Sequence, residues 1–179
     1  FDYMERLDLI GVEWLVTKNS FPDNPVFQKD VYNEYPIISV CLDVLVDEKI
    51  HNQKYVLNVL NIACETVDRV TVPILDESDM SDKNKRKKFC DLMDEVGDKF
   101  SHVQFSFESE MPARKLNEIV CLRENFKVTY DTGNITSSNI NHEEYIDFFA
   151  DKISNVHLKD RTMDRQTVEP TTGDTDFKS

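Results

Sequence analysis

The sequence predicts an α/β protein in which strands and helices alternate, in the form of an incomplete TIM-type (β/α)8 barrel. Six strand-like runs occur along the chain, and helix-like segments lie between most of them. In at least four of these runs the polar residues share the parity that would face into a barrel, whereas a parallel sheet covered by helices on both sides needs apolar residues on both faces. No G-x-G-x-x-G turn follows the first run, which disfavours an open dinucleotide-binding sheet. About six βα units are visible, and the first and last strands of a complete barrel are not evident.

The chain begins with a helix-like segment and one strand. Residues 1–10 carry an apolar stripe typical of the end of a helix, and residues 12–16 alternate as a strand with Glu13 on the inward parity. Residues 17–35 contain two prolines among several Asn and Asp residues. We therefore expect mostly a loop there, in place of a full crossover helix.

The next βα unit is clearer. A second strand is expected over residues 36–46, with Asp43 on the inward parity. Apolar residues then recur at helical spacing, namely Tyr55, Val56, Val59, Leu60, Ala63 and Val67. The third strand, residues 69–75, ends at Asp76, where an acid commonly caps the following helix.

The middle of the chain continues the same alternation. The lysine-rich residues 83–88 read as the solvated first turns of a helix rather than as a binding patch. The fourth strand spans residues 103–108 and brings Glu108 to the inward parity at its exit. Pro112 suits the first turn of the next helix, which is expected over residues 113–123.

Two further strand-like runs end in Asp131 and His157, and the amphipathic residues 141–153 between them are long enough for a crossover helix. Because active groups of a barrel gather at the carboxyl ends of its strands, Glu108, Asp131 and His157 are expected at one level on neighbouring strands. Two carboxylates and an imidazole suit a divalent cation such as Mn²⁺, Co²⁺, Zn²⁺ or Mg²⁺.

Composition limits the class of protein. A chain of 179 residues with 40% apolar and 10% aromatic residues predicts a single globular domain over residues 1–179. A net charge of -13 and a pI near 4.7 would repel a phosphate backbone, so nucleic-acid partners are disfavoured. No apolar stretch is long enough to span a bilayer and no signal-peptide pattern is present, which predicts a cytoplasmic protein without a membrane partner. The chain opens on Phe1 rather than Met, so we expect an excerpt of a longer gene product.

The cysteines and the remaining histidines are not predicted to belong to a functional site. The cysteines show no C-x-x-C spacing, so we expect free, buried thiols at Cys41, Cys64, Cys90 and Cys121. The other histidines stand in loop or helix-start contexts and read as surface residues, namely His51, His102 and His142.

Short motifs along the chain carry a family resemblance. They are Tyr-Asp-Thr-Gly-Asn at 130–134, Val-His-Leu-Lys-Asp-Arg at 156–161, Gly-Val-Glu-Trp-Leu-Val at 11–16, Asn-Pro at 24–25, Ser-Val-Cys-Leu-Asp at 39–43 and Phe-Ser-Phe-Glu at 105–108. Together they resemble the xylose-isomerase-like TIM-barrel superfamily, most closely its sugar phosphate isomerase/epimerase branch. The resemblance covers nearly the whole chain, although no single motif is unique to the family. The acidic charge disfavours the more distant endonuclease IV branch.

The resemblance implies a ligand set. Glu108, Asp131 and His157 match the positions that bind the divalent metal, and Glu108 would also act as a catalytic acid/base. The family completes the set with a Glu from its last strand, which has no counterpart in this sequence; Glu169 is the last Glu and is poorly placed, just before a turn at Gly173. Two of these residues have alternative roles to metal binding. Asp131 could cap a helix, and His157 could be a hydrogen-bonded histidine of the core.

The resemblance further implies which residues contact the substrate. The expected contacts are Glu13, Asp43, Asn134, Lys159 and Asp160. For Lys159 and Asp160 the alternative is a plain surface ion pair.

The implied reaction is an aldose-ketose isomerisation or an epimerisation of a sugar or sugar phosphate. A proton moves next to a carbonyl, and the metal stabilises the enediolate. The alternatives are a dehydratase or lyase acting on a keto-polyol, and a non-catalytic barrel that binds a sugar or a partner chain. A homo-oligomer is compatible with the sequence.

Overall fold

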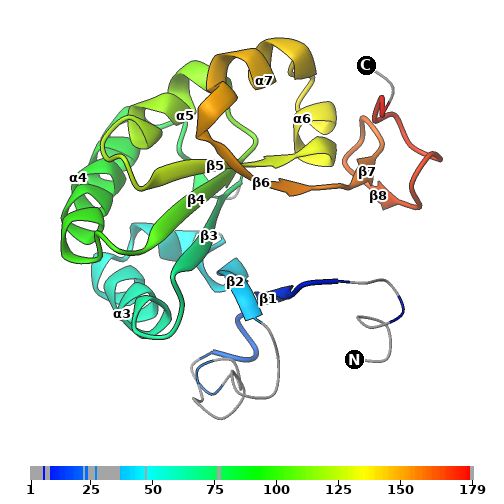
Figure 1. The fold of residues 1–179 in the computed structure, drawn as a ribbon. Coiled ribbons are helices and arrows are strands. Elements are labelled where there is room, and N and C mark those ends of the chain that lie inside the picture. The colour runs from blue at the N-terminus through cyan, green and yellow to red at the C-terminus, as the bar shows by residue number, and fades with distance from the viewer. Residues whose placement is uncertain are drawn as a thin grey trace.

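The computed structural model describes residues 6, 9–21, 23, 27, 37–46, 48–75 and 78–177, without the side chain of residue 48. Six strands form one sheet in chain order, with β1 at one edge and β6 at the other, and every neighbouring pair is parallel (Figure 1). The strands are β1 (Val12–Leu15), β2 (Ile37–Cys41), β3 (Arg69–Ile74), β4 (Gln104–Ser109), β5 (Phe126–Asp131) and β6 (Ile153–His157). The sheet curls into part of a barrel, which confirms the predicted incomplete TIM-type fold.

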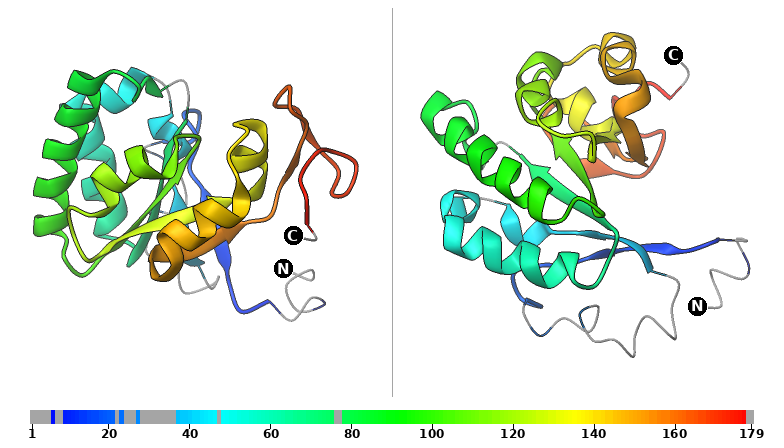
Figure 2. Two further views of the ribbon diagram at one scale, coloured as in Figure 1. Left: turned by 90° about the horizontal axis from the view of Figure 1, so that it is seen from above. Right: turned by 60° about the vertical axis from the view of Figure 1, so that its left-hand side comes forward.

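Helices follow the strands, and the longer ones lie along the outer side of the curled sheet (Figures 1 and 2). The described α-helices are α3 (Gln53–Cys64), α4 (Lys83–Lys99), α5 (Ala113–Val120), α6 (Thr132–Ser137) and α7 (His142–Phe149). Short 3-10 turns are η2 (Asp43–Leu45), η3 (Glu48–His51) and η5 (Ala150–Lys152). After β6, an antiparallel hairpin of β7 (Asp160–Arg161) and β8 (Thr167–Val168) extends beyond the edge of the sheet.

Side-chain caps fix where α3, α4 and α7 begin, and α6 is capped in the same way by a residue of the candidate site described below. Asn52 accepts a hydrogen bond from the Tyr55 backbone N–H before α3. Asp82 accepts two backbone N–H groups at the start of α4, and Asn141 accepts one at the start of α7. Each cap satisfies amide donors that have no partner within the helix, so the chain enters these helices at the polar residue itself.

The hydrophobic core lies between the helices and the outer face of the sheet. Phe105 and Phe107 of β4 and Phe126 of β5 are fully buried, and their rings meet edge to face with centroids 5.7 and 5.2 Å from that of Phe126. Gly97 of α4 packs against this cluster, where an added Cβ would lie 2.7 Å from the Phe126 ring. The absence of a side chain at this glycine thus lets α4 approach the sheet closely.

The inner face of the sheet is polar, as the parity of the strands predicted. Thr129 of β5 donates to the Ser106 hydroxyl of β4 at 2.7 Å, and the Ser154 hydroxyl of β6 lies 3.3 Å from that of Ser106. Gln104 donates to Ser154 at 3.0 Å. These hydroxyls satisfy one another, so this part of the inner face holds polar groups that are paired.

Several predicted boundaries are wrong. The second strand was expected to reach residue 46, but β2 ends at Cys41, because the Val44 N–H bonds to the Val16 carbonyl and the chain turns into η2. The helix expected over 113–123 ends at Val120, and the segment expected as one helix over 141–153 divides into α7, η5 and the first residue of β6. Helix α6 was not predicted from the sequence.

Some predicted features fall outside the described residues. These are most of the helix-like segment 1–10, much of the loop 17–35, and Asp76. All four cysteines are free thiols, but only Cys41 and Cys64 are buried, since Cys90 is partly exposed and Cys121 fully so.

The two outer strands leave apolar side chains open to solvent. Leu15 of β1 is 54% exposed, Val156 of β6 is 49% exposed and Leu158 just after it is 77% exposed. In the described sheet, β1 and β6 each have a strand neighbour on one side only.

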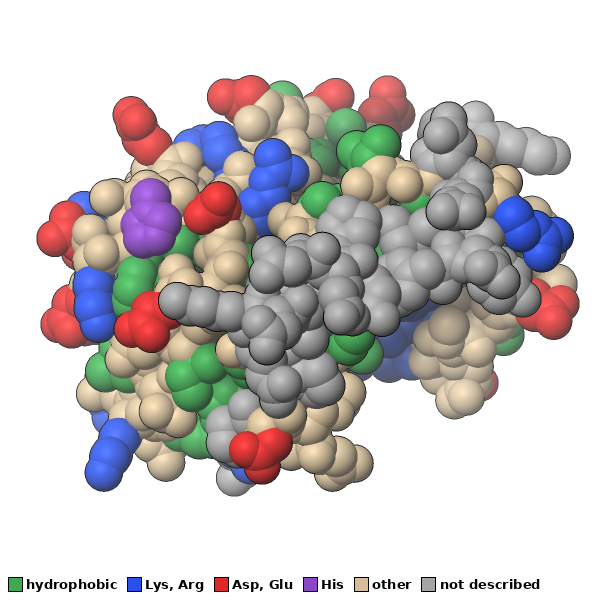
Figure 3. Space-filling model, turned by 60° about the horizontal axis from the view of Figure 1, so that its bottom comes forward, with side chains coloured by type: hydrophobic (Ala, Val, Ile, Leu, Met, Phe, Trp, Pro, Cys, Tyr) green, Lys and Arg blue, Asp and Glu red, His purple; other side chains and the backbone are tan. Residues whose placement is uncertain are grey.

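On the face shown in Figure 3, acidic and basic side chains of the described residues are interspersed. None of the helices in the described part of the chain combines the length and the apolar character needed to cross a lipid bilayer.

Candidate metal centre

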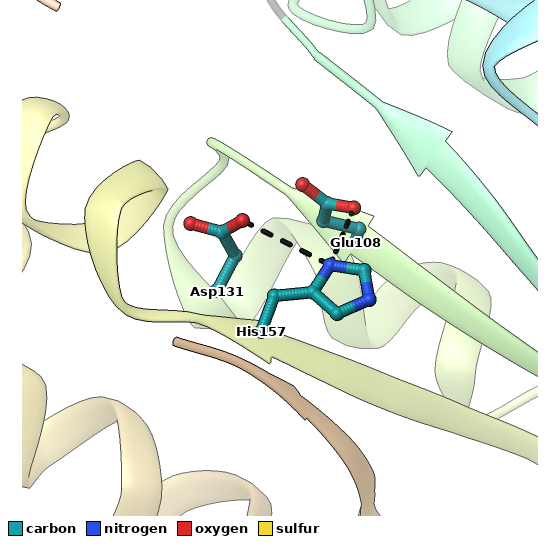
Figure 4. Close-up of side chains that lie close together, drawn as sticks. All are labelled: Glu108, Asp131 and His157. Atoms are coloured by element: carbon teal, nitrogen blue, oxygen red, sulfur yellow. Dashed lines mark ion pairs between the residues drawn. The ribbon is translucent and has the colours of Figure 1, made fainter. Parts of the chain in front are cut away.

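Three side chains from neighbouring strands converge at the carboxyl-terminal side of the sheet. Glu108 is the next-to-last residue of β4, while Asp131 and His157 end β5 and β6 and are direct partners in the strand register. One ligand atom from each lies within 4.8 Å of the other two, and Figure 4 shows the side chains pointing toward one another. The expected meeting of these residues is therefore seen in the geometry.

The imidazole of His157 faces both carboxylates with one ring nitrogen. Its Nδ1 lies 3.2 Å from Glu108 Oε2 and 3.9 Å from Asp131 Oδ2. Glu108 and Asp131 are 5% and 2% exposed, so their charges are largely removed from water. Buried carboxylates need a compensating cation, and a histidine cation or a metal ion can supply it.

The start of α6 holds both carboxylates in place. Asp131 Oδ1 accepts the Asn134 backbone N–H at 2.8 Å, which makes Asp131 the N-cap of this helix. The Asn134 side chain donates to Glu108 Oε1 at 2.6 Å. The cap therefore uses one oxygen of Asp131, and the other oxygen faces His157, so the capping alternative and a ligand role are compatible.

Lys159 brings a positive charge to the same group. Its Nζ lies 2.7 Å from Asp131 Oδ2 and 4.0 Å from Glu108 Oε1. The ammonium thus balances one carboxylate charge at the rim of the cluster.

The pKa values follow from burial and these contacts. Burial and the nearby charge of Glu108 raise the pKa of Asp131 above its ordinary value, in spite of Lys159. Burial also raises the pKa of Glu108, but the hydrogen bond with His157 and the charge of that ring outweigh it, and the pKa of Glu108 is lowered. Hydrogen bonds to Glu108 and then to Glu13 raise the pKa of His157 to about 10.

Glu13 of β1 contacts His157 from the opposite side. Its Oε1 lies 2.6 Å from His157 Nε2. Its Oε2 accepts hydrogen bonds from Ser39 at 2.7 Å, from Thr71 at 2.8 Å and from Asn155 at 3.2 Å. The inward parity of Glu13 was visible in the sequence, but its pairing with His157 was not.

A cavity of about 290 Å³ opens beside this cluster. Of the predicted substrate contacts, Glu13, Asp43 and Lys159 line it. Arg161 also lines it and pairs with Glu110 at 3.0 Å. The sequence reading gave Arg161 no role, although it ends the quoted Val-His-Leu-Lys-Asp-Arg motif.

Two predicted substrate contacts lie elsewhere. Asn134 is fully buried, and its amide is directed at Glu108 rather than into the cavity. Asp160 is 1% exposed and accepts the backbone N–H groups of Gly173 at 2.8 Å and Thr175 at 3.1 Å. Its carboxylate thus holds its own loop together, and the alternative of a surface ion pair is wrong as well.

His142 corrects another expectation. It was read as a surface residue, but it is partly buried and its ring nitrogens contact the hydroxyls of Tyr130 and Thr136. Burial lowers the pKa of His142.

The chemistry of the cluster fits a divalent cation. Two carboxylate oxygens and one imidazole nitrogen on a common side are ligands that Mn²⁺, Co²⁺ and Zn²⁺ accept, and the adjoining cavity leaves room for substrate oxygens. The Lys159 ammonium would have to move away from Asp131 when such an ion binds, because both carry positive charge.

Sequence comparison finds no matching family model and no significantly similar curated protein. Comparison of structures does find related folds. The IolI protein, in a crystal structure with a bound zinc atom, superposes with a TM-score of 0.68 at 17% identity, covering 98% of this chain and 74% of that one. The probable 3-DHS dehydratase AsbF of Bacillus anthracis gives 0.63 at 11% identity, covering 90% and 66%.

The 3-keto-D-glucoside 4-epimerase YcjR of E. coli, in its apo form, gives a TM-score of 0.60 at 15% identity, covering 96% of this chain and 75% of that one. The chain thus spans between 66% and 75% of the lengths of these three proteins. At such low identities the likeness concerns the fold. The chain therefore shares the barrel-type fold of these three proteins, as its sequence had predicted.

Proposed function

We propose that this chain acts as a divalent-metal-dependent isomerase or epimerase on a small sugar or sugar phosphate. The observation that carries the proposal is the convergence of Glu108, Asp131 and His157 beside a cavity at the carboxyl ends of the strands. A bound zinc atom in the IolI structure and the epimerase activity named for YcjR support this class of chemistry on the same fold.

The residues present suggest how each would contribute. Glu108, Asp131 and His157 would hold the ion, which, when bound, polarises a carbonyl next to the carbon that loses its proton. Glu108 is ionised at neutral pH because its pKa is lowered, so it can accept that proton. Asn134 holds the Glu108 carboxylate through Oε1 at 2.6 Å, which leaves Oε2 toward the cluster.

The substrate would occupy the cavity that Asp43 and Lys159 line. The Lys159 ammonium is 31% exposed and can donate to a substrate oxygen once it leaves Asp131. Among the described residues the metal group consists of three side chains, so the second acid/base of the reaction has no assigned residue.

A dehydratase that acts on a keto-polyol is the second candidate. The dehydratase named among the similar structures, AsbF, supports it. Both reactions begin with removal of a proton next to a carbonyl, and they differ in whether the proton returns or water leaves.

The test measures proton transfer directly. The purified chain, loaded with Mn²⁺, is incubated in D₂O with a panel of keto sugars and sugar phosphates, and deuterium incorporation is followed by NMR. We expect incorporation at the carbon next to the carbonyl for one member of the panel. Loss of water with formation of a conjugated carbonyl would instead identify the dehydratase.

Two variants control this experiment. Glu108→Gln should retain the fold and lose deuterium incorporation, because an amide cannot accept the proton. His157→Asn should lose the metal and the activity together. A folded, metal-loaded parent that shows neither exchange nor dehydration would leave a sugar-binding or partner-binding barrel as the better account.

A further inference from the structure

We propose that Glu13 is a positioning residue: it fixes the His157 ring so that Nδ1 faces Glu108 and Asp131. Glu13 was expected to contact substrate, and it does line the cavity. Its hydrogen bonds, however, direct it to the histidine. The inference rests on the proposed metal-dependent function, because a ring held in this way serves to present Nδ1 as a ligand.

The first argument is that both oxygens of the Glu13 carboxylate are engaged by neighbouring side chains. Oε1 lies 2.6 Å from His157 Nε2, and Oε2 accepts from donors on three different strands, namely Ser39 of β2, Thr71 of β3 and Asn155 of β6. A carboxylate held by four contacts cannot turn toward a sugar without breaking several of them. Its side chain is 20% exposed, which limits exchange with solvent.

The second argument concerns the two nitrogens of the ring. Glu13 acts as an acceptor, since its Oε2 accepts hydrogen bonds from Ser39, Thr71 and Asn155. Such a carboxylate accepts a hydrogen bond from Nε2–H, so the lone pair of the neutral ring lies on Nδ1. Nδ1 is the nitrogen that lies 3.2 Å from Glu108 Oε2 and 3.9 Å from Asp131 Oδ2.

A carboxylate that accepts a hydrogen bond from the ring nitrogen not bound to the metal raises the basicity of a ligating histidine and sets its tautomer. Removing such a carboxylate typically weakens metal binding 10- to 100-fold. Here that carboxylate belongs to the strand at the opposite edge of the sheet. Glu13 and His157 are 144 positions apart and lie on the outer strands β1 and β6, so the contact crosses the interior of the curled sheet. The geometry of the site thus depends on the curvature that brings these two strands face to face.

The experiment compares Glu13→Gln with a matched control, Glu110→Gln. Glu110 is also a largely buried carboxylate near the cavity, but it pairs with Arg161 and not with His157. Mn²⁺ affinity is measured from the EPR signal of the free ion. We expect Glu13→Gln to weaken Mn²⁺ binding 10- to 100-fold and Glu110→Gln to change it less than about threefold.

A second readout needs no metal. In metal-free protein labelled with ¹⁵N-histidine, the parent should show a hydrogen-bonded ring proton on Nε2 of His157, identified by its loss in His157→Asn. In Glu13→Gln this proton signal should move upfield, because an amide oxygen is a weaker acceptor than a carboxylate.

The outcomes separate the inference from the proposed function. Unchanged Mn²⁺ affinity together with an unchanged His157 signal in Glu13→Gln overturns the inference. The absence of a hydrogen-bonded Nε2 proton in the folded parent also overturns it, even where the variant does not fold. If no form binds Mn²⁺ but the His157 signal responds to Glu13→Gln, the positioning contact stands and the proposed metal-dependent function fails.

Discussion

Proton competition at His157 should control metal binding. In the metal-free protein the pKa of His157 is raised to about 10 by its hydrogen bonds to Glu108 and Glu13. An incoming ion must therefore displace a proton from Nδ1 at neutral pH, because a ligating histidine is neutral. The structure thus predicts that metal binding strengthens as pH rises.

The size of the effect follows from the pKa. A pH of 7 lies about three units below the His157 pKa of about 10. Removing the ring proton at that pH therefore lowers the free energy gained on metal binding by about 4 kcal/mol, at about 1.4 kcal/mol per unit. Between pH 6 and pH 8 the apparent association constant should rise about 100-fold, a slope of about one on a logarithmic scale. About one proton should leave per ion bound at pH 7.

Two measurements check this prediction. Mn²⁺ titrations followed by EPR at pH 6, 7 and 8 give the slope, and calorimetry in two buffers of different ionisation enthalpy counts the protons released. The variant His157→Asn should bind weakly and lose most of the slope. Tight binding by the parent with an affinity independent of pH would refute the reasoning, because the ring could not then carry the proton that the ion displaces.

Three further predictions concern stability and the loop after β6. Phe126→Ala should lower the free energy of unfolding, measured in urea, by about 3–5 kcal/mol, because Phe126 is fully buried. Phe148 is 46% exposed, so Phe148→Ala should lower it by less than about 1 kcal/mol. Equal losses in the two variants would contradict the assigned core. The His157 pKa is higher in the folded protein than the ordinary 6.5, so its contribution to stability is complete below pH 6.5 and is lost as pH rises through about 10. The urea midpoint of the metal-free parent should therefore fall more between pH 7 and pH 10 than that of His157→Asn, and parallel falls would count against it. Asp160→Ala should speed proteolysis within residues 162–176, because the backbone bonds to this carboxylate are lost, while Mn²⁺ affinity changes less than about threefold; an unchanged digestion pattern would argue against this role.

The sequence alone predicted the alternating fold and the three residues of the candidate centre. Alternation of polar and apolar residues fixes which side chains of a strand share a face, and parallel strands bring their carboxyl ends to one edge. Glu108, Asp131 and His157 stand at such exits one βα unit apart, so local pattern was enough to place them together.

Other features depended on contacts between distant parts of the chain. The early end of β2 follows from a hydrogen bond between Val44 and Val16. The direction of the Asn134 and Asp160 side chains depends on the groups around them, which are Glu108 in one case and the loop near Gly173 in the other. A sequence shows that a residue is polar, but it does not show which partner will satisfy that polarity.

The contact between Glu13 and His157 shows this division most clearly. The sequence placed each residue on the inward parity of its strand, because side-chain direction alternates along any strand. Only the tertiary structure joined them, since they lie 144 positions apart on the two outer strands. Side-chain parity is a local property of the backbone, whereas the distance across the sheet is set by its curl, which arises from the packing of all six strands and their helices.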